Sequence, residues 1–137
     1  MGMPNAECQM PNFPTPTNMT TNNDLKARTK RFALRILKLI DALPNSRKGR
    51  IISDQLGRAG TAVGANYRAS CRARSRAEVI AKIGIVEEEA DESAYWMELI
   101  MEGEILPAKK VAALHAEALE LTAIMAASRL TATRNKR

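Results

Sequence analysis

The stretch GRAGTAVGANYRASCRARSR, residues 57–76, places three glycines and five arginines in twenty positions. Glycine-rich stretches bind phosphates in nucleotide-binding enzymes, and clusters of arginine bind nucleic acid. Glycines at helical intervals also allow a helix to approach a neighbour closely. The stretch is therefore a phosphate-binding loop, a nucleic-acid-binding surface or a closely packed helix, and the rest of the chain decides between them.

The glycine spacing argues against a phosphate-binding loop. A Walker loop needs G-x-x-x-x-G-K-[ST] between a strand and a helix, and a dinucleotide-binding fingerprint needs G-x-G-x-x-G after a strand. The chain has Gly57, Gly60 and Gly64, with no Lys-Ser/Thr pair after them and no strand predicted before them. At about 100° per residue the three glycines share one narrow stripe of a helix, so the spacing predicts a helix.

The small-residue stripe predicts a close contact. Each glycine inside a helix costs about 1 kcal/mol relative to alanine, so three in a stripe indicate that a backbone or a bulky side chain lies against them. Tyr95 and Trp96 are adjacent, and both cannot face one narrow core. We expect one of them to fill the glycine groove, within the subunit or from a neighbour. The candidates for packing or for an oligomer interface are Gly57, Gly60, Gly64, Tyr67, Tyr95 and Trp96.

Apolar residues recur every three or four positions in four segments, which is typical of amphipathic helices. The hydrophobic share of the chain is 45% and the aromatic share only 4%, which favours helices over strands. The expected inward positions are Leu25, Thr29, Phe32, Ile36, Leu39 and Leu43, then Ile52, Leu56, Ala59, Val63 and Asn66, then Val79, Ile83, Val86, Ala90, Met97 and Ile100, and finally Val111, Leu114, Ala118, Leu121 and Met125.

Capping and helix-breaking residues separate the four segments. The expected helix starts are Asp24, Asn45 or Ser46, the capping box Ser75–Glu78, and Pro107. The expected ends are Pro44, Cys71 and Gly103. The connections are short, so consecutive helices should be antiparallel. We predict an all-α fold, an up-down antiparallel four-helix bundle over residues 24–130, between a disordered N-terminal head (residues 1–23) and a basic C-terminal tail (residues 131–137).

Basic and acidic residues are segregated along the chain. Residues 24–76 carry 14 Lys or Arg against 3 Asp, whereas residues 77–128 carry 11 Asp or Glu against 3 Lys. The basic half binds polyanions or complements the acidic half, and both interpretations remain open. The candidate nucleic-acid-binding residues are Arg47, Lys48, Arg50, Arg58, Arg68, Arg72, Arg74 and Arg76. Aromatic residues for stacking on bases are few, so binding should be weakly sequence-specific.

Patterns for catalysis and metal binding are weak. The acidic residues between positions 87 and 92 suggest a di-metal bundle, but such sites also use Glu-x-x-His motifs, and the single histidine, His115, lies in none. The two cysteines lack the spacing of a metal site. We therefore expect no metal, no cofactor and no enzyme activity. The chain has neither a run of about 18 apolar residues nor a signal-peptide pattern, so we expect a cytoplasmic protein with no membrane partner.

Two separate blocks of the sequence resemble a known family. They are QLGRAGTAVGANY, residues 55–67, and EADESAYWMEL, residues 89–99, with Lys82 between them. Their order and spacing are similar to those of the four-helix-bundle proteins encoded in intervening sequences of bacterial 23S rRNA genes, some of which carry the misleading label of ribosomal protein S23. The resemblance extends over residues 25–125. Many members have Glu after Asn-Tyr-Arg, where this chain has Ala69.

The resemblance implies a homopentameric ring of up-down bundles. It also implies kinship with the accessory variability proteins of diversity-generating retroelements, which bind nucleic acid and a reverse transcriptase through a basic surface. We therefore expect a non-enzymatic oligomeric protein whose partners are its own copies, RNA or DNA bound without sequence specificity, and, where one exists, a protein partner. The alternative is a structural or protein-adaptor ring that binds no nucleic acid.

Overall fold

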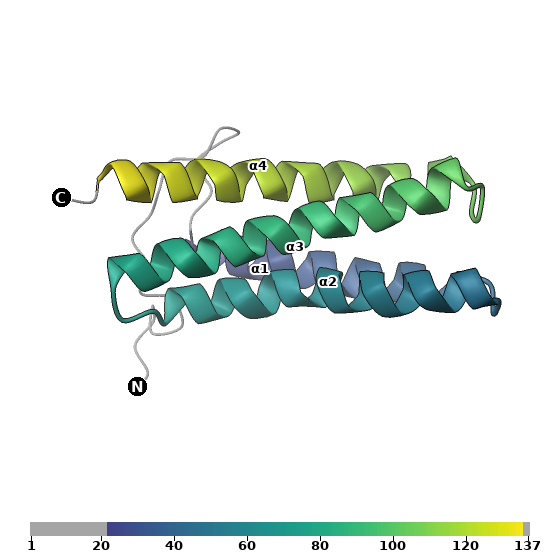
Figure 1. Ribbon diagram of the computed structural model, residues 1–137, viewed down its shortest axis with the longest axis horizontal. Coiled ribbons are helices and arrows are strands. Elements are labelled where there is room, and N and C mark those ends of the chain that lie inside the picture. Colours follow the sequence, from purple (N-terminus) through teal and green to yellow (C-terminus); the bar gives the residue numbers. More distant parts are fainter. Residues whose placement is uncertain (1–21, 136–137) are drawn as a thin grey trace.

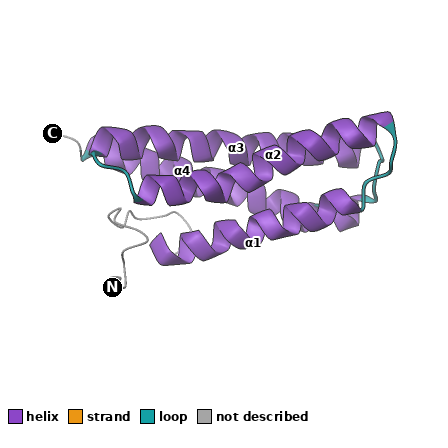
Figure 2. Cartoon of the chain, turned by 90° about the horizontal axis from the view of Figure 1, so that it is seen from below, coloured by secondary structure: helices purple, strands orange, loops and turns teal. Residues whose placement is uncertain are grey.

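The computed structural model describes residues 22–135, which form four long helices and one short 3-10 helix. The long helices are α1 (Asn22–Asp41), α2 (Arg47–Cys71), α3 (Arg76–Glu102) and α4 (Ala112–Arg134), and η1 (Ala108–Lys110) precedes α4. Consecutive helices run antiparallel along one long axis (Figures 1 and 2). α1 packs on α2, α2 on α3, and α3 on α4, whereas the contact between α1 and α4 is much smaller. The predicted all-α, up-down four-helix bundle is confirmed.

The predicted apolar seams meet in one core, and all but two of the expected inward positions are buried. Leu43 is only half-buried because α1 ends at Asp41, before it. Asn66 is also half-buried, and its side-chain amide donates a hydrogen bond of 2.9 Å to the Ala62 carbonyl oxygen. Its neighbour Tyr67 takes the core position and is fully buried. The apolar periodicity therefore predicted Asn66 as the last inward residue of the second segment, whereas the buried residue is Tyr67, one position later.

Two serines cap helix starts: Ser75 does so as predicted, and Ser46 is the residue that caps α2 of the two alternatives Asn45 and Ser46. The Ser46 hydroxyl accepts a hydrogen bond of 3.1 Å from the Gly49 amide, which satisfies a free donor in the first turn of α2. Ser75 does the same for the Glu78 amide at 3.1 Å. The expected return bond differs, because the Glu78 carboxylate accepts from the amide of Arg74, at 2.9 Å, and not from that of Ser75. The carboxylate thereby holds the turn that precedes α3.

Some helix ends differ from the expected boundaries. α1 begins before Asp24, which lies in its first turn. Gly103 follows α3 as expected, but the left-handed residue is Glu104, with φ 56°. Pro107 precedes the 3-10 helix η1 rather than α4 itself, and α4 continues to Arg134. The expected disordered head falls almost entirely outside the described residues. No helix in the described part of the chain is long and apolar enough to cross a membrane.

The glycine stripe of α2 is filled by α1. A Cβ atom at Gly60 would lie 2.7 Å from the Cγ1 atom of Ile36, which is closer than real Cβ contacts allow. At Gly64 it would lie 3.3 Å from the carbonyl oxygen of Thr29, so there the backbone of α1 itself is close. We expected Tyr95 or Trp96 to fill this groove, but within the subunit α1 fills it instead. Close approach of the two helices explains why glycine occupies these positions.

Candidate nucleic-acid interface

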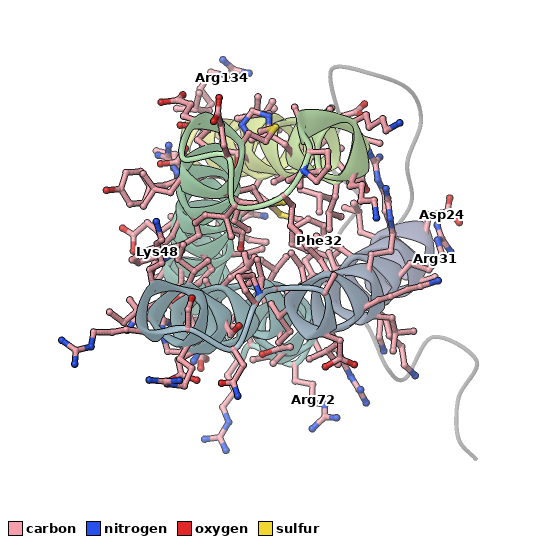
Figure 3. All side chains as sticks on the ribbon, turned by 90° about the vertical axis from the view of Figure 1, so that its right-hand side faces the viewer. Asp24, Arg31, Phe32, Lys48, Arg72 and Arg134 are labelled. Carbon is pink, nitrogen blue, oxygen red and sulfur yellow. The ribbon has the colours of Figure 1, made fainter. Side chains whose placement is uncertain are left out.

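Four of the candidate arginines gather at one end of the bundle, where α2 turns into α3. They are Arg68 in the last turn of α2, Arg72 directly after that helix, Arg74 in the connecting turn and Arg76 at the start of α3. We call these four residues the end cluster. All four side chains are exposed, and Arg72 projects away from the bundle (Figure 3). Within residues 22–135 none of them forms an ion pair with a carboxylate.

A favourable interaction with a helix dipole explains the positions of only some arginines of the end cluster. Cations near the C-terminus of a helix interact favourably with its dipole, and Arg68 and Arg72 have this position on α2. Arg76 has the opposite position, because it is the first residue of α3 and lies at the positive end of that helix. The carboxylate in that turn, Glu78, accepts from a backbone amide. The charge of the end cluster is therefore left exposed to solvent.

Three other candidates lie at the opposite end of the bundle. Arg47, Lys48 and Arg50 occupy the first turn of α2 and are all exposed. Arg50 donates a hydrogen bond of 3.2 Å to the side-chain oxygen of Asn45. A helix rises about 1.5 Å per residue, so the 25 residues of α2 separate this group from the end cluster by about 35 Å. The predicted basic residues do not form a single patch.

Arg58 belongs to neither group, because it pairs with the acidic helix α3. Its guanidinium lies 2.6 Å from a carboxylate oxygen of Glu92 and 3.3 Å from one of Glu89. The hydrogen bond to Glu92 is the main cause of the raised pKa of Arg58. The indole nitrogen of Trp96 donates to the same Glu92 oxygen that Arg58 contacts, at 3.0 Å. Arg58 therefore links α2 to α3 and contributes little free positive charge.

The other paired carboxylates of α3 face α4. Glu87 accepts from the Nε atom of Arg129 at 2.8 Å, and Glu98 lies 2.8 Å from the Nε2 atom of His115. The hydrogen bond to Glu87 raises the pKa of Arg129. In the described part of the chain no group of three or more His, Cys, Asp or Glu residues is arranged to hold a metal ion. Arginines of the same subunit thus pair with three carboxylates of α3, which are Glu87, Glu89 and Glu92.

The six candidates for packing or for an interface divide into two sets. The three glycines and Tyr67 lie inside the subunit, and burial raises the pKa of the Tyr67 hydroxyl. Tyr95 is 53% exposed and Trp96 is half-buried, and their rings meet edge to face with centroids 5.3 Å apart. Of the six residues only Tyr95 is exposed, and it is therefore the most accessible for contact with another molecule.

The sequence did not single out Arg134, which is exposed in the last turn of α4. The antiparallel order of the helices places the C-termini of α2 and α4 at the same end, so Arg134 and the end cluster share that end. Figure 3 shows Arg134 on the other side of the bundle from Arg72. The up-down order of the helices was enough to predict that Arg134 and the end cluster lie at the same end of the bundle. The side of the bundle on which Arg134 lies depends on how α4 is rotated about its axis, which the sequence does not show.

Comparisons with known proteins agree on one group. Residues 21–127 match the family described as 23S rRNA-intervening sequence protein. The chain is also similar to the crystal structure of a protein of unknown function from the S23 ribosomal protein family of Bacteroides thetaiotaomicron. The two chains are 33% identical and superpose with a TM-score of 0.74, over 80% of this chain and 98% of that chain. No curated protein matches the chain.

Proposed function

Because the chain belongs to the family of 23S rRNA-intervening sequence proteins, we propose that it is a non-enzymatic, homo-oligomeric protein that binds RNA or DNA through the end cluster. The observation that carries this proposal is the exposure of four arginines within nine positions, with no ion pair in the described part of the chain. In the proposal the oligomer is a ring of five, as the family resemblance implies. Neither a metal nor a cofactor takes part.

The chemistry of the end cluster suits phosphate groups. A guanidinium keeps its charge at all physiological pH values and donates two parallel hydrogen bonds to phosphate oxygens. Contacts to the phosphate backbone carry no sequence information, so binding is non-specific. Base stacking contributes little, because Tyr95 lies 19 residues after Arg76, which is about 28 Å along α3. Electrostatic attraction to the backbone is the main source of affinity.

A ring strengthens this attraction, because every subunit contributes one end cluster to the same rim. The summed field of like charges attracts a polyanion over a distance of about 8–10 Å at physiological salt. A single nucleic-acid strand then contacts the clusters of neighbouring subunits. Affinity depends on the assembly as well as on the four arginines.

The second candidate is a structural or protein-adaptor ring that binds no nucleic acid. The ion pairs of Arg58 with Glu89 and Glu92, and of Arg129 with Glu87, favour it, because they neutralise part of the acidic helix within the subunit. In that case the end cluster pairs with carboxylates of a neighbouring subunit or of a partner protein. Loss of arginines from the end cluster would then loosen the assembly and leave nucleic-acid affinity negligible throughout.

Two matched double variants test the proposal by fluorescence anisotropy with mixed-sequence RNA and DNA at several salt concentrations. Arg68→Ala/Arg72→Ala should weaken binding to all sequences alike. It should also flatten the slope of log affinity against log salt by about 1.8 on duplex DNA and about 1.4 on single strands, since two phosphate contacts are lost. Arg47→Ala/Lys48→Ala removes the same charge at the other end and should leave the slope unchanged. Equal effects of both variants would assign binding to net charge and contradict the proposal.

A further inference from the structure

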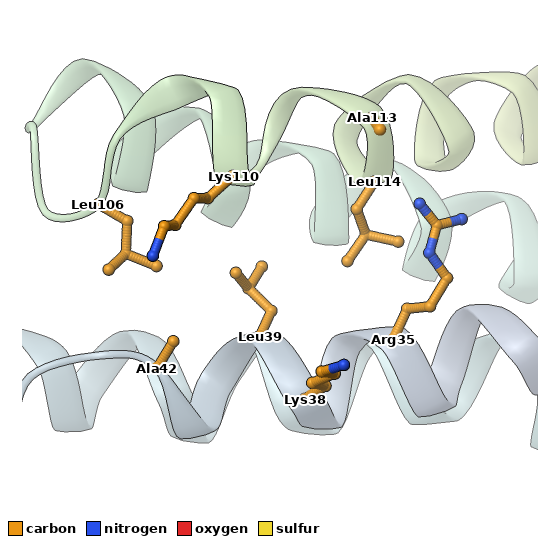
Figure 4. A pocket seen from close by; sticks show the side chains of 8 residues that line it. All are labelled: Arg35, Lys38, Leu39, Ala42, Leu106, Lys110, Ala113 and Leu114. Carbon is orange, nitrogen blue, oxygen red and sulfur yellow. The ribbon is translucent and has the colours of Figure 1, made fainter.

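A groove of about 470 Å³ lies between α1 and α4, near the end of the bundle opposite the end cluster. Leu39 and Leu114 form its buried floor, and Leu106 is half-buried beside them. Three cationic side chains, Arg35, Lys38 and Lys110, stand around these leucines (Figure 4). The groove therefore combines an apolar floor with a positively charged rim.

The packing of α1 explains why the groove is open. The glycine stripe allows α1 to lie close to α2, and Gly57 and Gly60 contact the half of α1 that borders the groove. The other half of α1 is held to α4, because Arg28 contacts Glu117 at 2.7 Å and Glu120 at 2.9 Å. The seam between α1 and α4 is closed at one end by these ion pairs and left open at the other.

The charges of the rim are not neutralised within the described part of the chain. Arg35, Lys38 and Lys110 are all exposed, and none pairs with a carboxylate of residues 22–135. Grooves between two helices commonly bind one face of a third helix, which places apolar side chains on the floor. Around this groove, carboxylates on such a helix would meet the three cations. The groove therefore fits an acidic amphipathic helix.

The outer face of α3 has this chemistry. Tyr95 is 53% exposed and lies on one face with the exposed carboxylates Glu88, Asp91 and Glu102, and Ile85, which is 37% exposed, lies at the edge of this face. None of these three carboxylates forms an ion pair in the described chain, unlike Glu87, Glu89, Glu92 and Glu98, which face α2 or α4. The groove borders residues 35–42, about 10 Å of chain, and so holds part of the α3 face, which extends about 26 Å from Ile85 to Glu102. The two surfaces are complementary in charge, and both carry apolar side chains.

We infer that the outer face of α3 of one copy docks in the α1–α4 groove of the next copy. The inference deepens the proposed function and rests on its homo-oligomer, for which it names the two surfaces. α1 and α3 are not neighbouring helices in the bundle, so the groove and the α3 face lie on different sides of it. Each copy can therefore use both surfaces at once. A contact between two different surfaces is heterologous and builds a ring when its rotation closes.

Charge reversal tests this inference by light scattering at micromolar concentration. Lys38→Glu/Lys110→Glu reverses the groove, and Glu88→Lys/Asp91→Lys reverses the α3 face. Each pair alone should reduce the assembly to the 15.1 kDa monomer, because like charges then face each other. All four substitutions in one chain should restore the wild-type size, because the reversed surfaces are complementary again. Circular dichroism checks that each variant folds.

Arg47→Glu/Lys48→Glu is the matched control, because it reverses two exposed cations outside both surfaces and should leave the size unchanged. An oligomer whose size survives both reversals would mean that the groove has another occupant, such as a foreign acidic helix, and would overturn the inference. Failure of the four-fold variant to reassemble would overturn it too. A monomeric wild type contradicts the homo-oligomer of the proposed function as well. Nucleic-acid binding is measured separately, since no substitution here touches the end cluster.

Discussion

At the scale of single residues, the contact between Gly60 and Ile36 is the most sensitive point of the fold. A methyl group at Gly60 would lie 2.7 Å from the Cγ1 atom and 3.0 Å from the Cβ atom of the fully buried Ile36, so it would meet that side chain near its own backbone. Overpacking of this kind costs about 1–3 kcal/mol. We expect Gly60→Ala to lower the free energy of unfolding in urea by about that amount, and Gly60→Leu to cause a larger loss.

Gly84 provides the control for this prediction. It also lies inside a long helix, but a Cβ atom there would be 3.7 Å from its nearest neighbour, the Cδ atom of Arg129. That is an ordinary contact. Gly84→Ala should therefore raise the free energy of unfolding by up to about 1 kcal/mol, since alanine is the better helix former. Equal effects at Gly60 and Gly84 would show that α1 does not lie as close to α2 as described.

At the scale of elements, Glu92 joins α2 to α3 and should make stability depend on pH. The hydrogen bond from Trp96, followed by the interaction with Arg58, lowers the pKa of Glu92 against the opposing effect of burial. A lowered pKa in the folded state gives stability that is present above the unfolded value of about 4.3 and is lost as pH falls through the folded value. Glu92→Gln should therefore reduce the loss of stability between about pH 7 and pH 3.

The expected reduction is up to about 1 kcal/mol, because Arg58 is half exposed and solvent weakens the ion pair. Urea unfolding at both pH values measures it. Asp54→Asn is the control, since this exposed carboxylate of α2 has no ion pair in the described chain and lies outside both proposed surfaces. A loss of stability in acid that is the same for Glu92→Gln as for the wild type would contradict the role of Glu92.

The sequence predicted the helices themselves but not the contacts between them. Apolar spacing predicted four helices, and all but two of the positions that it placed inward are buried, although it missed others such as Ile124 and Ala132. Capping residues predicted two helix starts, at Asn45 or Ser46 and at Ser75, because these signals are local. The partners of Arg58 and the helix that faces Gly60 depend on how each helix is rotated in the bundle. The same is true of the groove beside Lys38. No local pattern in the chain carries that rotation, so these contacts required the structure.

At the scale of the whole molecule, we predict an assembly whose two functions use different surfaces. In this proposal the end cluster of Arg68 to Arg76 contacts nucleic acid, while the α1–α4 groove and the outer face of α3 join the copies. Because the groove lies near the opposite end of the bundle, assembly leaves the end clusters exposed and brings them together on one rim. A monomeric variant should consequently bind nucleic acid more weakly than the assembly, with the arginines unchanged.

The most direct test of nucleic-acid binding is the salt dependence of the intact protein's affinity for a mixed-sequence duplex, followed by fluorescence anisotropy. Four arginines of one end cluster account for a slope of log affinity against log salt of about −3.6 on duplex DNA. We expect binding at about 50 mM salt with a slope steeper than this value, since clusters of neighbouring copies contact the same duplex. Absence of binding at about 50 mM salt, to RNA and to DNA alike, would contradict the proposed function.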